Sequence, residues 1–169
     1  ALAELRAGGP EASLAAPHLQ ALQAEFFLRT GRLDAAIAAF REARRKMRAL
    51  PGPDGWSQAL FRLESIGRAA VDAAAWDLAA ETAADMRAHD PAYGGTQYLL
   101  ALVAERAGDR GTAVTHLEHA VHAWRDADAD FTDLARARAR LAGIRGVRRR
   151  PPPVLVPSVP WTTMYTWVP

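Results

Sequence analysis

The fold is decided by residues 19–40, which read LQALQAEFFLRTGRLDAAIAAF. Apolar residues recur at three- and four-residue steps on both sides of Gly31, and this spacing is typical of one face of an α-helix. A glycine between two such segments is a turn residue. The stretch therefore predicts two helices joined by a short turn.

The same pattern returns twice further along the chain. Gly108 lies at the centre of ERAGDRGTA (residues 105–113), and Ala74 holds the corresponding position in AAAWDLA (residues 73–79). The spacings from 31 to 74 and from 74 to 108 are 43 and 34 residues. The longer interval contains ALPGPDG (residues 49–55), a cluster that breaks helices. Three copies in near-register predict stacked helix hairpins, with an alanine-rich bundle as the alternative.

Each copy supplies equivalent packing residues after its turn. A small residue comes first, and Phe40, Ala83 or Leu117 follows one helical turn later. The small residues are Ala36, Ala79 and Ala113. Over about residues 17–126 this pattern resembles the tetratricopeptide repeat (TPR) family, whose period is 34 residues. The tryptophan usual near the start of each TPR is missing.

The resemblance implies an all-α fold, a right-handed α-solenoid of about three TPR-like hairpins plus a capping helix. Residues 1–10 are then the end of a preceding helix or a linker, residues 11–147 the repeat domain with its cap, and residues 148–169 an extended tail. The expected helices span 17–30, 33–49, 55–73, 75–89, 92–107, 109–126 and 131–145. In the last of them, Phe131, Leu134, Leu141 and Ile144 form the apolar stripe.

The resemblance also implies a concave groove lined by the first helix of each hairpin. Its groove-facing residues would be Ala21, Leu22, Glu25, Leu28, Arg29, Phe61, Glu64, Ser65, Arg68, Tyr98, Leu99 and Leu102. Ala21 and Glu25 stand where chaperone-binding members carry a lysine–asparagine pair, so no clamp for a C-terminal carboxylate is expected. An apolar floor with arginines suits an extended or helical peptide. The alternative for each apolar residue is packing between repeats.

The composition changes abruptly at Arg148. Prolines prevent a helix through residues 151–160, and the following residues are rich in β-branched and aromatic side chains. We expect this tail to lie against its own groove, a partner subunit or a symmetry-related copy. Its candidate anchors are Val154, Leu155, Val156, Trp161, Met164, Tyr165 and Trp167.

A basic patch precedes the tail, with Asp133 as the lone acid beside it. It consists of Arg136, Arg138, Arg140, Arg145, Arg148, Arg149 and Arg150. Nucleic acid, an anionic membrane surface and an acidic protein are the candidate targets. Because no aromatic residue is interleaved for base stacking, nucleic acid is disfavoured, and an acidic protein surface is favoured.

Residue types needed for catalysis or metal binding are missing or badly spaced. The chain has no cysteine, no glycine-flanked serine elbow and no phosphate-binding glycine loop. The run HLEHAVH (residues 116–122) resembles a metal site, but three-residue steps drift by about 60° on a helix. We expect these histidines to be exposed on an outer face. The sequence predicts no catalytic residue, metal or cofactor.

The overall composition does not indicate the cellular compartment of the protein. The 169 residues are half hydrophobic with a formal net charge of +2, and Lys46 is the only lysine among many arginines and alanines. This bias resembles proteins of GC-rich bacteria. No apolar run approaches the roughly 20 residues of a membrane span, and no signal-like segment is present. Because the chain begins at Ala1, we expect a processed product or a piece of a longer protein.

Stacked helix hairpins usually bind other proteins. The sequence therefore predicts a non-catalytic interaction scaffold, or an accessory subunit of a larger assembly, that binds protein subunits or other copies of itself through the groove and the tail. One alternative is a peripheral adaptor that meets anionic membrane or nucleic acid through the basic patch. Another is the C-terminal interaction module of a longer enzyme or electron carrier.

Overall fold

The computed structural model describes residues 10–48, 53–128 and 130–148, and within these ranges it contains seven α-helices and no strand. The all-α prediction is therefore confirmed. The helices are α2 (Pro10–Arg29), α3 (Leu33–Arg48), α4 (Pro53–Asp72), α5 (Trp76–His89), α6 (Gly94–Arg106), α7 (Arg110–Ala123) and α8 (Thr132–Arg148).

Two helices extend several residues beyond the bounds that the sequence predicted. Helix α2 begins at Pro10 and includes Pro17, which we expected at its first turn. A proline suits a first turn because its missing N–H has no partner there, and Pro10 meets that condition. Helix α8 continues to Arg148, three residues beyond the prediction.

The three turns have the same backbone conformation. Gly31, Ala74 and Gly108 have φ angles of +74°, +55° and +79°. In each turn the following residue donates its N–H to a carbonyl five residues back: Arg32 to Phe27, Ala75 to Ala70 and Asp109 to Ala104, at 2.8, 2.8 and 2.9 Å. This is the Schellman pattern that ends helices at a left-handed residue. The three positions aligned from the sequence are therefore equivalent in the structure.

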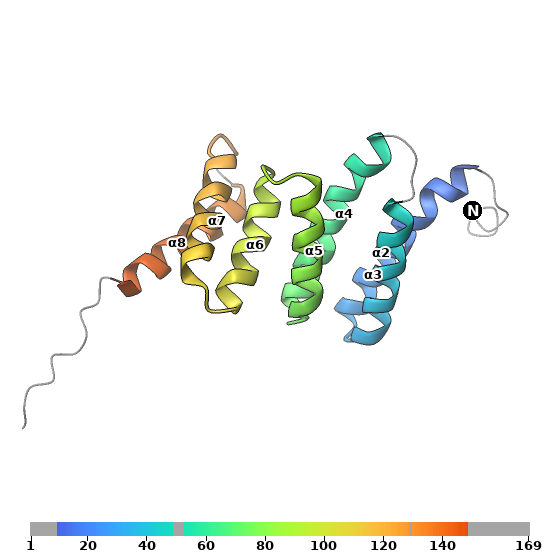
Figure 1. The fold of residues 1–169 in the computed structure, drawn as a ribbon, viewed down its shortest axis with the longest axis horizontal. Helices are drawn as coiled ribbons and strands as arrows, with labels where there is room; N and C mark the ends of the chain where they lie inside the picture. Colours follow the sequence, from blue (N-terminus) through green and yellow to red (C-terminus); the bar gives the residue numbers. More distant parts are fainter. Residues whose placement is uncertain (1–9, 49–52, 129, 149–169) are drawn as a thin grey trace, which may run out of the picture.

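The hairpins follow one another in a row, α2–α3, then α4–α5, then α6–α7, with α8 at the end (Figure 1). The first helices of the hairpins run in one direction and the second helices in the other (Figure 1). Helix α4 contacts both α2 and α6, and α8 packs on α7. The first helices consequently form one continuous side of the row.

Small residues allow the helices to approach one another closely. Ala36, Ala79 and Ala113 are each 0% exposed, as the repeat register predicts. Between hairpins, a Cβ on Gly67 of α4 would overlap the side chain of Leu99 of α6. The buried residues form two clusters, one over α2–α5 and Leu99, the other over α6–α8.

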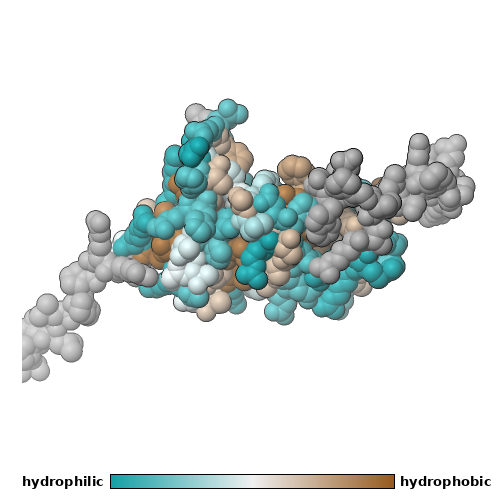
Figure 2. All heavy atoms as spheres, turned by 45° about the horizontal axis from the view of Figure 1, so that its top comes forward, coloured by the Kyte–Doolittle hydropathy of each residue, from teal (hydrophilic) through white to brown (hydrophobic). Residues whose placement is uncertain are grey.

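Helix α8 covers the second cluster with its apolar stripe. Leu134, Leu141 and Ile144 are buried, as predicted, while Phe131 precedes the helix and packs edge-on against Trp124, with 5.2 Å between ring centroids. None of the helices in the described ranges has the length and apolar character that crossing a membrane requires. On the face drawn in Figure 2, hydrophobic residues reach the surface as patches between hydrophilic ones.

Candidate functional site: a groove along the first helices

The predicted groove residues divide into a buried set and an accessible set. Leu28, Tyr98, Leu99 and Leu102 are at most 8% exposed and belong to the core, together with Ala21. The accessible predicted residues are Leu22, Glu25, Arg29, Phe61, Glu64, Ser65 and Arg68. The alternative of packing between repeats therefore holds for the apolar residues of α6, because α6 lies close against Gly67.

Large apolar side chains remain exposed on α2 and α4. We name Leu19, Leu22, Phe26 and Phe61 the apolar strip; their exposed fractions are 43%, 42%, 58% and 65%. The sequence prediction missed Leu19 and Phe26. The signal was present, because both lie on the side of α2 opposite the buried stripe of Pro17, Ala21, Ala24 and Leu28.

A side-chain hydrogen bond connects α2 to α4 and aligns Glu25 with Ser65 along the two helices. Ser65 Oγ donates to Glu25 Oε2 at 2.7 Å, and this bond lowers the pKa of Glu25 more than any other contact does. Leu22 and Phe61 lie about one turn before the bonded residues of their helices. Because the two helices contact each other and run in the same direction in Figure 1, the exposed residues Leu22 and Phe61 lie at a similar level on neighbouring helices.

A polar network follows on α4 and connects it to α6 and α8. Tyr93 Oη donates to Glu64 Oε2 at 2.6 Å, and burial together with this bond raises the pKa of Tyr93. Arg68 Nη2 contacts Glu64 Oε1 at 2.5 Å and Asp133 Oδ2 at 2.6 Å. Arg136 approaches the same Asp133 carboxylate at 3.5 Å. The network holds the start of α8 against the C-terminal part of α4.

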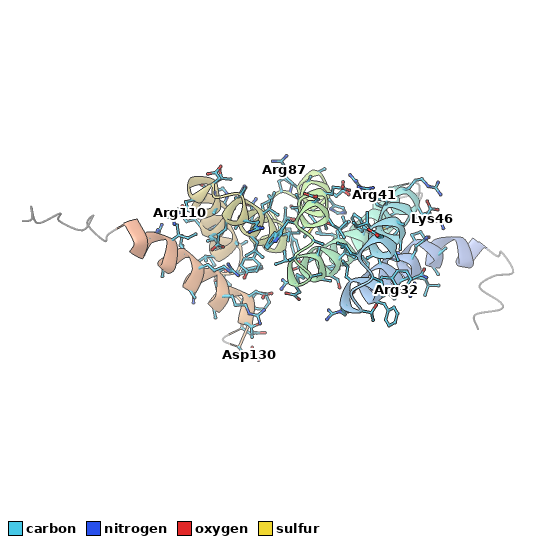
Figure 3. All side chains as sticks on the ribbon, turned by 90° about the horizontal axis from the view of Figure 1, so that it is seen from below. Arg32, Arg41, Lys46, Arg87, Arg110 and Asp130 are labelled. Carbon is cyan, nitrogen blue, oxygen red and sulfur yellow. The ribbon has the colours of Figure 1, made fainter. Side chains whose placement is uncertain are left out.

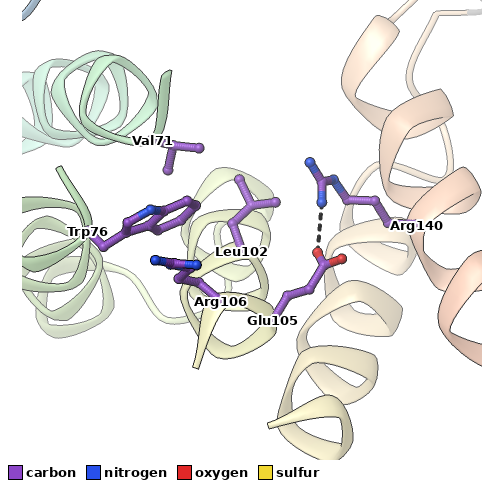
Figure 4. Close-up of a pocket in the computed structure, with 6 residues that line it drawn as sticks. All are labelled: Val71, Trp76, Leu102, Glu105, Arg106 and Arg140. Carbon is purple, nitrogen blue, oxygen red and sulfur yellow. Dashed lines mark hydrogen bonds and ion pairs between the residues drawn. The ribbon is translucent and has the colours of Figure 1, made fainter. Parts of the chain in front are cut away.

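A hollow lies beyond this network, between α4, α6, α8 and the start of α5 (Figure 4). One part has a volume of about 370 Å³ and an adjoining part about 330 Å³. Because both parts are lined by Val71, Leu102 and Arg140, we treat them as a single depression and name it the Trp76 hollow. Its lining residues are Arg68, Val71, Asp72, Trp76, Tyr98, Leu102, Glu105, Arg106, Arg136 and Arg140.

Charged groups at the rim of the Trp76 hollow interact with one another. Arg140 Nη1 donates to Glu105 Oε2 at 2.7 Å, the contact dashed in Figure 4. The Arg106 guanidinium lies over the ring of Trp76, 5.6 Å from its centroid. The floor between these groups is apolar and consists of Val71, Leu102 and the indole ring.

The basic patch carries less unpaired charge than the sequence indicated. Arg136, Arg138, Arg140 and Arg145 are exposed, but Arg140 pairs with Glu105 and Arg145 with Glu118. These acids come from α6 and α7, so the expectation of a lone Asp133 was wrong. The side chain of Arg148, the residues Arg149 and Arg150, and all the tail anchors lie outside the described residues.

The opposite side of the row is formed by α3, α5 and α7. Arg41, Arg87 and Arg110 follow one edge of it in Figure 3. Contrary to the expectation of exposure, His116 is half-buried, with Nδ1 2.7 Å from Gln97 Oε1. His119 and His122 are exposed as expected. Across the described ranges, no group of three or more His, Asp or Glu is placed to hold a metal ion.

Similarity to known proteins does not identify this groove. No protein-family model matches the chain, and no curated protein matches its sequence. The TPR resemblance therefore stays a prediction, and the function has to be inferred from the surface itself.

Proposed function

We propose that this chain is a non-catalytic protein–protein interaction scaffold, or an accessory subunit of a larger assembly, that binds its partner through the groove and the C-terminal tail. The apolar strip carries the proposal. Single exposed apolar residues are ordinary on protein surfaces, whereas clustered ones mark interaction sites. Burying one such side chain is favourable by about 1.5–3 kcal/mol, so a partner that covers Phe26 and Phe61 gains a substantial part of its affinity there.

The architecture proposed with it is the right-handed, TPR-like α-solenoid. Three equivalent left-handed turns, the alternating helix directions and the contacts of α4 with both α2 and α6 support this arrangement. In such an array the first helices line the concave binding surface, and the apolar strip and most of the residues that line the Trp76 hollow belong to these helices.

Partner capture from a native bacterial extract tests the proposal. The chain is compared with the double variant Phe26→Ser/Phe61→Ser and with a form lacking residues 148–169. Leu33→Ser is the matched control, because Leu33 is 42% exposed at the start of α3 and outside the strip. We expect a partner retained by the parent and the control but lost from the double variant and the truncated form. Equal capture of the partner by all four proteins would contradict the proposal.

The second candidate is a peripheral adaptor for anionic membrane or nucleic acid, supported by the exposure of four arginines of the basic patch. Salt separates the two functions. Binding that depends on phosphate contacts falls steeply between low and physiological ionic strength, whereas binding through the apolar strip largely survives. The ion pairs of Arg140 and Arg145 with their own chain favour the scaffold. The third alternative, an interaction module of a longer enzyme or electron carrier, has no support from a particular contact.

A further inference from the structure

We propose that the Trp76 hollow is the docking site of the chain's own segment 151–160, PPPVLVPSVP, bound in cis. The proposal rests on the proposed function only in that the hollow belongs to the same groove. It names the occupant of the part of the groove that lies nearest to α8.

The lining of the hollow matches the chemistry of that segment. Proline-rich segments bind grooves lined by aromatic side chains, where the rigid proline rings pack with little loss of conformational entropy. In the hollow the half-buried Trp76 indole, over which Arg106 lies, forms an apolar floor with Val71 and Leu102. The segment offers five prolines, three valines and a leucine to these surfaces.

Charge also favours a neutral occupant. Segment 151–160 contains no charged residue. The Arg140–Glu105 pair and the Arg106–Trp76 contact at the rim are already formed within the chain. An anionic ligand would compete with Glu105 for Arg140, whereas a neutral segment leaves both contacts in place and covers the apolar floor.

The chain that follows α8 is long enough for segment 151–160 to reach the hollow. Helix α8 forms one wall of the hollow through Arg140 and ends at Arg148, eight residues later, which corresponds to about 12 Å of helix. An extended proline-rich chain covers about 3.1 Å per residue, so four or five residues return it to the level of Arg140. The apolar strip is a less suitable site, because it lies on α4 and α2, and each further helix adds about 8–10 Å.

Disulfide trapping in the full chain tests the proposal, because the native sequence contains no cysteine. Asp72→Cys is introduced in the lining together with Val156→Cys in the segment. The matched control combines Val156→Cys with Arg110→Cys, an exposed position on the opposite edge (Figure 3). A second control keeps Asp72→Cys and Val156→Cys but replaces the rest of 151–160 by Gly and Ser, which gives the rate expected from a tethered flexible chain alone.

We expect the chain with Asp72→Cys and Val156→Cys in the native segment to form an intramolecular disulfide at least about tenfold faster than both controls, since docking raises the effective concentration above that of a flexible tether. Trp76→Ala in the same chain should reduce the rate to that of the Gly/Ser control, while circular dichroism shows retained helix. Equal rates in the native and Gly/Ser segments overturn the proposal. So do disulfides formed mainly between two copies, because they place the segment in trans.

No partner is present in this measurement. Its failure therefore leaves the partner-capture result unaffected, and loss of partner binding by the strip variant leaves the cis contact standing.

Discussion

Arg68 of α4 and Asp133 of α8 form an ion pair, with 2.6 Å between Nη2 and Oδ2, although the whole α6–α7 hairpin separates them in the sequence. The Asp133 side chain is 9% exposed, and Arg136 of its own helix approaches the same carboxylate. A buried carboxylate held by two arginines fixes the position of the helix that carries it. This pair consequently sets the distance between two walls of the Trp76 hollow.

Asp133→Asn should therefore lower the free energy of unfolding by about 1–3 kcal/mol, because the part-buried Arg68 loses a charged partner. Urea unfolding followed by circular dichroism measures the change. Asp128→Asn is the control, since Asp128 is exposed in the loop before α8. If both variants unfold at the same urea concentration, the pair does not hold α8 in place.

Ala74 is the one non-glycine residue with a positive φ angle in the described ranges, and it is exposed. For an alanine this conformation is unfavourable by about 1–2 kcal/mol. We expect Ala74→Gly to stabilise the protein by about 0.5–1 kcal/mol after the larger entropy of glycine in the unfolded chain is subtracted. Thermal unfolding measures the gain.

Two variants serve as controls for this substitution. Ala73→Gly, with an ordinary φ angle, should destabilise by about 0.5–1 kcal/mol. Gly108→Ala should also destabilise, although no atom lies within 4 Å of the added Cβ, because its φ angle is +79°. A gain for Ala73→Gly as large as that for Ala74→Gly would contradict the strain argument.

The positions of the three turns were predictable because a left-handed turn depends only on a few adjacent residues. These residues surround Gly31, Ala74 and Gly108. The small residues after each turn were predictable for the same reason. The burial of Leu99 was not, because it depends on how closely α6 approaches Gly67. The pairing of Arg140 with Glu105 likewise depends on where α8 packs, which no local pattern encodes.

Gly94 lies where α6 begins, directly under the indole of Trp124. A Cβ at this position would come within 2.7 Å of Trp124 Cε2. Gly94→Ala must displace a ring that also packs on Tyr98 and Phe131, so we expect a loss of about 1–3 kcal/mol. Near-ultraviolet circular dichroism should report the altered ring environment.

The matched control is Gly143→Ala in α8, where no atom lies within 4 Å of the added Cβ. There alanine should stabilise by up to about 1 kcal/mol, because it favours helix over glycine. A stabilising Gly94→Ala would show that the ring moves freely.

His116 should make stability depend on pH. Burial, followed by the charges of His119 and Arg87, lowers the pKa of His116 below its ordinary value of 6.5. The unfolded chain therefore binds a proton at a higher pH than the folded protein does. By linkage, stability is complete above about pH 6.5 and decreases as the pH falls from there towards the lowered pKa.

The hydrogen bond between Gln97 and His116 is compatible with protonation of the His116 ring. Its amide Nε2 donates to the carbonyl of Pro91 at 2.5 Å, which directs its Oε1 towards His116 Nδ1. That nitrogen carries a proton in the charged ring as well, so the hydrogen bond survives protonation and the loss of stability comes from burial and from the neighbouring positive charges.

His116→Gln should consequently reduce the drop in Tm between about pH 7.5 and about pH 5.5, the range in which an ordinary histidine changes charge. His122→Gln, an exposed residue on the same helix, is the control and should leave the drop as large as in the parent. Thermal unfolding of the three proteins at both pH values compares them directly. An unchanged drop in the His116→Gln protein would mean that another group governs the acid sensitivity of the fold.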